Sequence, residues 1–521
     1  MATDNYWATA PFPRLQQQLF SSTLDEAIAP DHPVRAFELI MVGLDWHAWE
    51  AAYPHIRGRP PIHPRKLASL LLYGLTIGLR SSRDLEETCQ TRLDCMWLME
   101  GLVPDHSTIC GFRTANQKQL KSLFRQICLL AAEMGLVRLN RVAIDGTTIR
   151  ANNGRYRTLT REKIEKRQEE LDQQIAQMLQ EAAVVDQDEN QRLGDKSNRL
   201  PPELQDLEQC KQKLKEALET IGQLEAAKKD GSKSPAQLPE TDPDSRVLLN
   251  KTGGYAPNYT CVVSTDATCG FIVDTVTIQG NAEGEQALPA TQRITETFGR
   301  APDATMADGN FAHGHVLEGY EEQQLNFYSP LDSSEVQPRD AAYREDPTQP
   351  VPEEKWDELP YRDRKKTQLD KSAFIYVAEE DVYYCPNGRP LSFVHTDRET
   401  RSGQQVETRR YQADDCSGCP LASRCLGGGK TRTIRRDQYA DVRERHVQKM
   451  QTEKAQDEYQ HRMGIVEPSF GTVKGNWNFR QFLLRGLQKV DTEWRWVCLA
   501  LNIMKIVTHG GALRAHVATE S

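Results

Sequence analysis

The chain has 521 residues, of which 38% are apolar and 7% aromatic, and its formal net charge is −9. This length predicts about three domains, at roughly 150 residues each. No run of about 18 apolar residues occurs, which excludes a membrane-spanning helix. The N-terminus lacks a basic segment followed by an apolar one, so we expect no secretory signal and a cytoplasmic location.

Charged residues are distributed unevenly along the chain, and their local balance matters more for binding a polyanion than the acidic total. Residues 51–140 contain 12 Lys and Arg against 7 Asp and Glu, and residues 459–489 contain 5 against 1. Residues 156–245 contain 14 against 20. The first two segments are therefore candidates for contact with nucleic acid, whereas the third need not approach it.

The segment from about residue 62 to 137 places apolar side chains at helical spacing. A later helix in it is expected to begin at Asp105 or Ser107, since either side chain can cap a first turn. This helix would carry Arg113 and Lys118 outward. Short helices with basic residues on the last one are typical of a helix-turn-helix, which makes Arg113 a candidate DNA-binding residue. An ordinary helical bundle with solvated charges fits the pattern equally well.

An α/β pattern begins at Arg141. The apolar residues before Asp145, followed by glycine and threonine, predict a buried strand that ends in a turn. The elements that follow predict a mixed sheet with helices on its faces. Further strands are expected near residues 259–264, 270–278, 304–306 and 325–328, with helices near 285–298 and 315–324, and the chain is expected to end in helices near 468–475 and 492–507.

Two stretches interrupt this pattern. Apolar residues recur every seven positions at Ile164, Leu171 and Met178, and again at Leu207, Leu214 and Ile221. Two such helices joined around residues 194–202 would form an antiparallel hairpin, a solvated coiled-coil arm whose function the sequence does not reveal. Residues 332–437 are polar and rich in Pro, Gly and Cys, which indicates an inserted module.

Three acids are the candidate catalytic residues. Asp145 and Asp308 each follow a short apolar run and precede a glycine, and a carboxylate at the end of a buried strand points into the crevice where α/β sheets place their sites. Taken alone, each Asp-Gly pair is more typical of a turn. Glu467 precedes Pro468, which predicts a helix start or kink at this acid. Lys474 stands seven residues later, on the same face of an α-helix.

Carboxylates held close together repel one another unless they are paired or bind metal. Hard oxygen ligands select Mg²⁺ or Mn²⁺. Two such ions can activate a water or a 3′-hydroxyl and stabilise the leaving oxygen. The three acids therefore predict phosphodiester hydrolysis and transesterification.

Taken together, these motifs resemble the DDE transposases of bacterial insertion sequences, in the group with a Tyr-Arg-Glu-Lys signature around the third acid. The resemblance covers most of the chain. It rests on residues 63–67, 104–109, 142–147, 307–311, 462–474, 482–487 and 500–505.

The resemblance implies an RNase H-like catalytic core in which Asp145, Asp308 and Glu467 bind the catalytic metals. It also implies contacts of Tyr459, Arg462 and Lys474 with the DNA backbone. The signature usually puts three residues between the Arg and the Glu, whereas four separate Arg462 from Glu467 here, so Arg485 could serve instead of Arg462. The implied partners are double-stranded DNA, as the element's terminal inverted repeats and as target, and a second copy of the chain on that DNA. During the reaction the protein would be associated with the nucleoid.

Four of the twelve cysteines lie close together in the sequence of the inserted module: Cys385, Cys416, Cys419 and Cys425. One CxxC pair with two further cysteines, in a segment with few large apolar residues, is typical of a structural Zn²⁺ site. An iron–sulfur cluster and four unbound thiols are the alternatives, and His395 could replace one cysteine.

These observations predict four regions: an N-terminal helical DNA-binding domain (1–140), the first part of the catalytic core with the hairpin at about 156–245 (141–331), the Cys-rich insertion (332–437), and the second part of the core with the terminal helices (438–521). The expected function is metal-dependent cleavage at the ends of a mobile element and strand transfer into target DNA. The alternatives are an inactive transposase-derived DNA-binding protein and a metal-dependent nuclease without strand transfer.

Overall fold

The computed structural model describes residues 23–53, 60–193, 202–226, 235–250, 253–362, 368–401 and 404–511. The expected join of the helical hairpin, around residues 194–202, lies almost entirely outside these residues. The chain divides into two compact units, each described here by itself. The first comprises Met1–Leu136, Val473–Phe479 and Asp491–Ser521, and the second comprises Val137–Thr472 and Arg480–Val490.

The first unit is helical. Its core includes three stacked or tilted aromatic rings: the centroid of Trp49 lies 5.4 Å from that of Phe112, and the centroid of Trp496 lies 6.2 Å from each of them. The last helix of the chain therefore completes the core that the N-terminal helices begin. The helices are α1 (Pro33–Val42), α2 (His47–Glu50), α3 (Pro64–Thr76), α4 (Ser82–Thr91), α5 (Leu93–Met99), α6 (His106–Ala115), α7 (Gln117–Glu133) and the greater part of α16 (Leu487–His509).

Helix α6 begins as its capping residue predicts, but its basic residue points inward. The Asp105 carboxylate accepts the backbone N–H groups of Ser107 and Thr108, so Asp105 is the N-cap. The expectation that Arg113 points outward is wrong. Arg113 is only 8% exposed and its guanidinium donates to the carbonyl of Arg80. The reason is helical spacing: Arg113 is four residues after a buried isoleucine, on the face that packs inward.

Lys118 is exposed, as expected, but it belongs to α7 and not to α6. On α7 it stands three and seven residues before the exposed Lys121 and Arg125. These three residues therefore form a basic stripe on one helix face, here called the α7 stripe.

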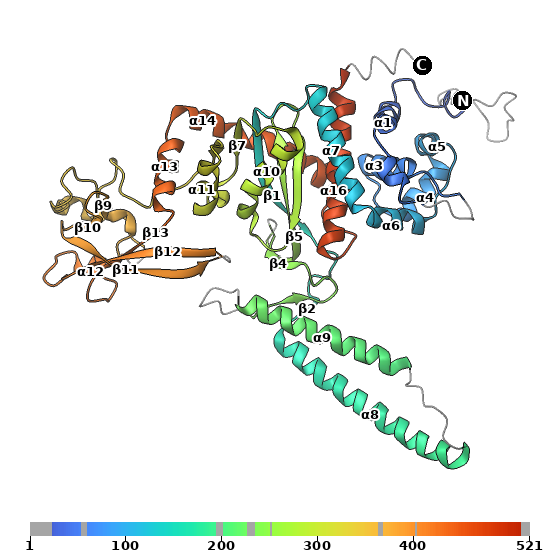
Figure 1. Ribbon diagram of the computed structural model, residues 1–521, viewed down its shortest axis with the longest axis horizontal. Helices are drawn as coiled ribbons and strands as arrows, with labels where there is room; N and C mark the ends of the chain where they lie inside the picture. The colour runs from blue at the N-terminus through green and yellow to red at the C-terminus, as the bar shows by residue number, and fades with distance from the viewer. Residues whose placement is uncertain are drawn as a thin grey trace, which may run out of the picture. The chain divides into compact units, whose positions relative to one another are not determined.

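The second unit is built around a mixed sheet, which confirms the mixed α/β class (Figure 1). The strand order is β4-β5-β1-β7-β8, with β6 paired to β5. Strand β1 runs antiparallel to β5 and parallel to β7, and β7 runs parallel to β8. The strands are β1 (Arg141–Arg150), β4 (Arg246–Leu249), β5 (Tyr255–Asp266), β6 (Phe271–Ile278), β7 (Ala304–Met306) and β8 (Phe327–Tyr328).

Helices cover this sheet. On one face Ile144 and Val262 pack with residues of α10, α11 and α13. Side chains alternate along a strand, so Asp145 faces the other side of β1, where α15 contacts β1 and β5. The elements are η1 (Glu283–Gln286), α10 (Ala287–Phe298), η2 (Gly309–Phe311), α11 (Gly314–Glu322), α13 (Ala440–Met450), α14 (Glu453–Gln460) and α15 (Arg462–Gly471), followed by a π-helix at Thr472–Asn476.

The expected turn after Asp145 does not occur, because β1 continues unbroken through Gly146 to Arg150. The residues after Gly146 include threonines and an isoleucine, whose branched side chains favour a strand. They keep pairing with β5 as far as Arg150. Asp145 therefore stands in the middle of a strand and not at its end.

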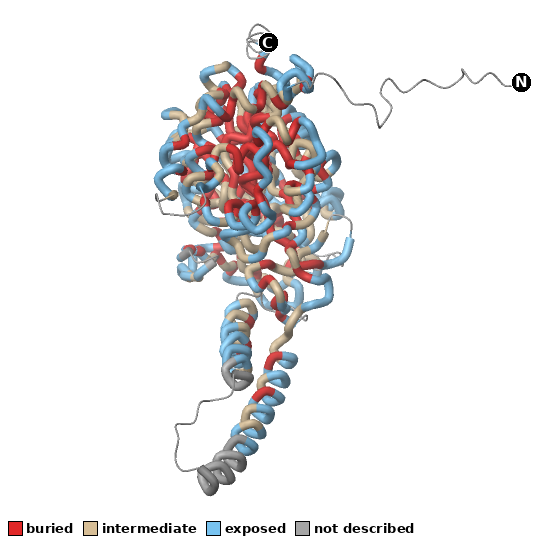
Figure 2. The backbone as a smooth tube through the Cα atoms, turned by 90° about the vertical axis from the view of Figure 1, so that its right-hand side faces the viewer, coloured by how far each residue is buried: buried red, intermediate tan, exposed pale blue. Residues whose placement is uncertain are grey.

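Two long helices, α8 (Arg161–Leu193) and α9 (Pro202–Ala226), lie between β1 and β5 in the sequence. Their buried residues, Ile164, Leu171, Leu214 and Ile221, stand at the seven-residue spacing and pack together. Figure 2 shows that the described parts of both helices are mostly exposed, with buried positions only at intervals. The short strands β2 (Thr158–Leu159) and β3 (Leu238–Pro239) pair at the base of this hairpin.

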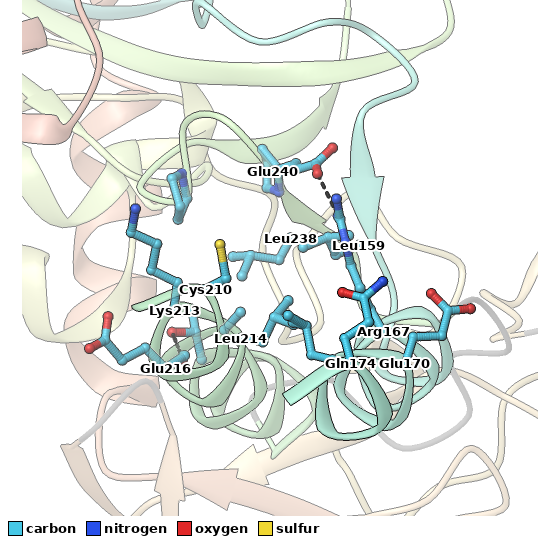
Figure 3. A pocket seen from close by; sticks show the side chains of 15 residues that line it. Leu159, Arg167, Glu170, Gln174, Cys210, Lys213, Leu214, Glu216, Leu238 and Glu240 are labelled. Atoms are coloured by element: carbon cyan, nitrogen blue, oxygen red, sulfur yellow. Dashed lines mark hydrogen bonds and ion pairs between the residues drawn. The ribbon is translucent and has the colours of Figure 1, made fainter. Parts of the chain in front are cut away.

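A cavity of about 570 Å³ opens at the base of the hairpin (Figure 3). Leu171 of α8, Leu214 of α9 and Leu238 of β3 contribute apolar side chains to its lining. At its rim the Arg167 guanidinium donates to the Glu240 carboxylate at 2.7 Å. Basic and acidic side chains, among them Lys213 and Glu216, line the cavity beside these apolar residues.

A second sheet follows in the Cys-rich region, with strand order β13-β12-β11-β10-β9 and antiparallel pairs throughout. Its core contains Phe374, Tyr383 and Tyr411. The Glu335 carboxylate lies 2.6 Å from the Arg436 guanidinium and 2.7 Å from the Lys371 ammonium, so a paired charge ties the sheet to the preceding segment. The elements are η3 (Glu353–Glu358), η4 (Lys371–Ala373), β9 (Ile375–Val377), β10 (Val382–Tyr384), β11 (Pro390–Arg401), β12 (Gln404–Ala413), α12 (Ala422–Cys425) and β13 (Thr433–Asp437).

Within the residues that the structure describes, no helix combines the length and the apolar character needed to cross a bilayer.

Candidate active site

Asp145 and Asp308 lie side by side because their strands are neighbours in register. Strands β1 and β7 are parallel, with Ala143 opposite Met306. Each aspartate stands two residues beyond its member of this pair. The pairing therefore brings two acids that are far apart in the sequence to corresponding positions on one side of the sheet.

The two carboxylates are held in the same way. Oδ1 of Asp145 accepts the N–H of Gly146 at 2.8 Å, and Oδ1 of Asp308 accepts the N–H of Asn310 at 3.0 Å. In each case the other oxygen, Oδ2, faces the guanidinium of Arg462. The backbone thus fixes one oxygen of each acid and leaves the second oxygen for a shared cation.

Arg462, the first residue of α15, supplies that positive charge. Its Nη2 atom lies 3.3 Å from Oδ2 of Asp145 and 4.0 Å from Oδ2 of Asp308. The Arg462 side chain is 12% exposed and those of the acids 22% and 32%. Its Nε atom is buried and has no hydrogen-bond partner among the residues that the structure describes. The guanidinium therefore stands where two like charges need compensation, and one of its donors remains available.

Tyr459, three residues before Arg462, belongs to the same cluster. Burial raises the pKa of its hydroxyl, the nearby Arg462 guanidinium lowers it, and the carboxylates of Asp308 and Asp145 raise it further. Because these three charged groups all act on the Tyr459 hydroxyl, the hydroxyl lies close to both carboxylates and to the guanidinium. The structure therefore groups four of the candidate residues, from β1, from the turn after β7, and from α14 and α15.

Glu467 is placed differently. It is exposed, whereas Val466 and Ser469 of the same helix are buried, and it makes no hydrogen bond or ion pair with either aspartate in the described residues. The extra residue between Arg462 and Glu467 explains this. An α-helix turns about 100° per residue, so a five-residue step separates two side chains by about 140°, whereas a four-residue step separates them by about 40°.

Lys474 lies in the π-helix that follows α15. The expectation that Glu467 and Lys474 share a face assumed an α-helix throughout, and the wider π-helical turn changes that relation. Among the described residues, no set of three or more His, Cys, Asp or Glu side chains is arranged to hold a metal ion. Asp145 and Asp308 supply hard oxygen donors suited to a divalent cation, but a third ligand is not in position beside them.

Arg485 lies near the end of β1. Its guanidinium donates to the carbonyl of Asn152 at 3.0 Å, and the next residue, Gly486, donates its N–H to the carboxylate of Asp242 at 3.0 Å. Arg150 and Gln481 form a bridge between this segment and β1. The segment with Arg485 is therefore attached to the same strand that carries Asp145, beyond its last residue.

The sequence pattern did not reveal three residues that support the site. The Ser329 hydroxyl donates to the carbonyl of Asp308 at 2.6 Å, and His446 Nε2 lies 2.8 Å from the carbonyl of Ser329. Glu283 lies under Gly146 on the opposite face of β1, because a Cβ added to Gly146 would meet the Glu283 carboxylate at 1.7 Å. Gly146, which directly follows Asp145, could have indicated in the sequence that another group approaches the strand closely here. No pattern in the sequence indicates the roles of Ser329 and His446.

Two family models match the chain. Residues 384–507 match a model described as "Transposase DDE domain", and residues 22–115 match one described as "Transposase domain (DUF772)". The first match includes Tyr459, Arg462 and Glu467 but begins after Asp145 and Asp308. No match was found among curated proteins. Both models describe transposase domains, which confirms the resemblance that the sequence motifs indicate.

Proposed function

We propose that this chain, which matches two models of transposase domains, is the DDE transposase of an insertion sequence, which cuts DNA at the ends of the element and joins those ends to target DNA. The substrates are the double-stranded terminal inverted repeats and the target, and a second copy of the chain acts on the paired end.

The observation that carries this proposal is the pair of aspartates that share one cation. Asp145 and Asp308 come from adjacent parallel strands and direct Oδ2 toward Arg462 at 3.3 and 4.0 Å. Acids are held this closely when a site concentrates negative charge for a cation. Their oxygens suit Mg²⁺ or Mn²⁺, which when bound would activate the attacking oxygen and stabilise the leaving one.

The mixed sheet supports the assignment of an RNase H-like core. An acid on the central strand β1, a second acid in the turn after the neighbouring β7, and a third acid on the helix α15 that contacts β1 suit such a core. Glu467 is the proposed third ligand, and its approach to the aspartates requires a rotation or kink of α15 near Pro468 that the substrate complex would stabilise.

Arg462 and Tyr459 are the proposed contacts to the DNA backbone at this site. The unpartnered Nε of Arg462 and the tyrosine hydroxyl can each donate to a phosphate oxygen. Lys474 and Arg485 are proposed to contact phosphates farther along the strand. The helical first unit is the proposed reader of the element's ends, through the α7 stripe and the start of α6.

A cleavage assay tests the proposal. Full-length protein is incubated with duplex DNA that carries the element's end, with Mg²⁺, with Mn²⁺ or with chelator. We expect cleavage with either ion and none with chelator. Asp145→Asn should remove cleavage but keep DNA binding, because the amide has nearly the same shape without the charge. Asp303→Asn, at an exposed acid before β7, is the matched control.

The same assay separates the alternatives. Nicked or cut ends without joined products would indicate a nuclease without strand transfer. End-specific binding without cleavage under any metal condition would indicate a DNA-binding protein that has lost activity, an outcome that the exposed position of Glu467 favours. Equal cleavage by wild type and Asp145→Asn would overturn the assigned site.

A further inference from the structure

Four cysteines of the β-rich module meet at one small cavity. Cys385 follows β10, Cys416 and Cys419 follow β12, and Cys425 ends α12. All four line a cavity of about 20 Å³. A space of this size holds a single atom or one water molecule.

The first cysteine loop is a tight turn that offers an N–H group to its sulfur. The N–H of Arg389 donates to Sγ of Cys385 at 3.4 Å, and the N–H of Gly388 donates to the Cys385 carbonyl at 2.8 Å. Gly388 has a φ of +73°, and a Cβ there would lie 1.9 Å from the carbonyl oxygen of Thr348. Only glycine fits this turn, and the N–H donor suits a sulfur that carries negative charge.

The second loop has a related form. Gly418, between Cys416 and Cys419, has a φ of +64°. The N–H of Cys419 donates to the carbonyl of Cys416 at 3.4 Å, which closes the turn. A turn of this kind places two cysteine side chains close enough to bind one ion.

Arginine side chains fix these loops relative to one another. The Arg389 guanidinium, from the first loop, donates to the carbonyl of Asp415 beside the second loop at 3.0 Å. The Arg432 guanidinium donates to the carbonyl of Cys425 at 3.1 Å. Both arginines also line the cavity and add positive potential near the sulfurs, which favours thiolates.

The four cysteine sulfurs are soft ligands, and together they would fill every position of a tetrahedral ion. Apart from the sulfurs, the cavity is lined largely by apolar residues such as Leu369, Leu421 and Leu426. Among the described residues, no Asp, Glu or His side chain lines the cavity, and Nε2 of His395 lies 3.0 Å from Oδ1 of Asp397 instead. The site suits a thiophilic ion with no open position for water.

We propose that Cys385, Cys416, Cys419 and Cys425 bind one Zn²⁺ ion in a closed tetrahedral site. The side chains as they lie do not yet surround an ion. Rotation of a cysteine about its Cα–Cβ bond moves the sulfur between staggered positions while the backbone stays in place. The proposal therefore rests on the turns and on the shared cavity.

The ion would join the ends of β10 and β12 to the segment that leads into β13. Two neighbouring strands of this sheet, β12 and β13, would then be linked to β10 through one atom. Since binding free energy at such a site is also folding free energy, loss of the ion would loosen this sheet.

Metal analysis of the purified full-length protein tests the proposal. We expect about one zinc per chain. The double variant Cys416→Ser/Cys419→Ser should retain less than about a tenth of it, whereas Cys110→Ser/Cys210→Ser, at two exposed cysteines elsewhere, should retain all of it. Four reduced thiols without zinc, iron with acid-labile sulfide, or equal zinc in the double variant would each overturn the site.

A second measurement covers the case in which the double variant does not fold. Wild-type protein, stripped of metal and titrated with Co²⁺, should develop the charge-transfer absorption of a tetrahedral thiolate complex at one equivalent. Its absence would overturn the proposal. Neither measurement depends on DNA cleavage. A negative result for the zinc site would therefore leave the proposed transposase activity untouched, and the reverse also holds.

Discussion

The Nη2 atom of Arg462 lies 3.3 Å from Oδ2 of Asp145, a carboxylate oxygen that could otherwise bind the divalent cation of the proposed chemistry. In this arrangement the guanidinium and the metal compete for one position.

Removal of the arginine should strengthen metal binding in the absence of DNA. In Arg462→Ala the two aspartates lose their shared cation, and we expect Mn²⁺ to bind about tenfold more tightly, which corresponds to about 1.4 kcal/mol. Calorimetry or Mn²⁺ resonance measures the affinity. Arg445→Ala, at an exposed arginine paired with Glu321, is the control and should bind Mn²⁺ as wild type does. Unchanged or weaker binding by Arg462→Ala would contradict the competition.

Gly146 and Glu283 should be energetically coupled across β1. A methyl group at residue 146 would collide with the Glu283 carboxylate, so Gly146→Ala must displace that side chain or the strand that holds Asp145. We expect Gly146→Ala to lower both the free energy of unfolding and cleavage. Glu283→Ala in the same chain should restore part of the stability, with a coupling of about 1 kcal/mol or more. A denaturant-based double-mutant cycle measures it, and additive effects would refute the contact.

The α7 stripe should contribute to DNA affinity through phosphate contacts. Replacing Lys118, Lys121 and Arg125 together by alanine should weaken binding to end DNA and reduce the slope of log affinity against log salt by about 2.7, at roughly 0.9 per contact. Titrations at several salt concentrations give this slope. The matched control replaces three exposed lysines of α9, Lys211, Lys213 and Lys215, and should leave the slope unchanged. Equal losses in both variants would indicate a general charge effect.

The second unit should lose stability under mild acid through His446. Burial lowers the pKa of His446, so between that pKa and about 6.5 the unfolded chain binds more protons than the folded one. The stability it contributes is complete above about pH 6.5 and is lost as the pH falls through the lowered pKa. His446→Gln, which can still donate to the Ser329 carbonyl, should flatten the change in melting temperature between about pH 7.5 and about pH 5.5. The same pH dependence in the variant would exclude this histidine as its source.

The sequence predicted the paired aspartates well because their position depends on local features. An apolar run before each acid predicts a central strand, and parallel neighbours then bring corresponding positions together. The direction in which the Glu467 side chain points from α15 could not be predicted in the same way. One additional residue before Glu467 turns its side chain by about 100° about the helix axis, and only the packing of Val466 and Ser469 decides which face is buried.

Side-chain direction was also the reason for the error at Arg113. Residue type alone favoured an exposed arginine, but tertiary packing placed it on the buried face beside a backbone carbonyl that accepts its hydrogen bond. Likewise, the strand through Gly146 continues because β5 supplies partners from a distant part of the chain. Such long-range pairs leave no periodicity near the residue concerned.

The pairing of β1 with β5 has a consequence for synthesis of the protein. The N–H of Leu139, just before β1, donates to the Asp266 carboxylate at the end of β5, 127 residues later. At about 5–20 residues per second, a ribosome needs roughly 6–25 s to produce that distance. During this interval the nascent β1 has an unpaired edge and apolar side chains. Its partner strand emerges only after both long helices have been made, so newly made chains should depend on chaperones at this stage and should aggregate when translation stalls within α8 or α9.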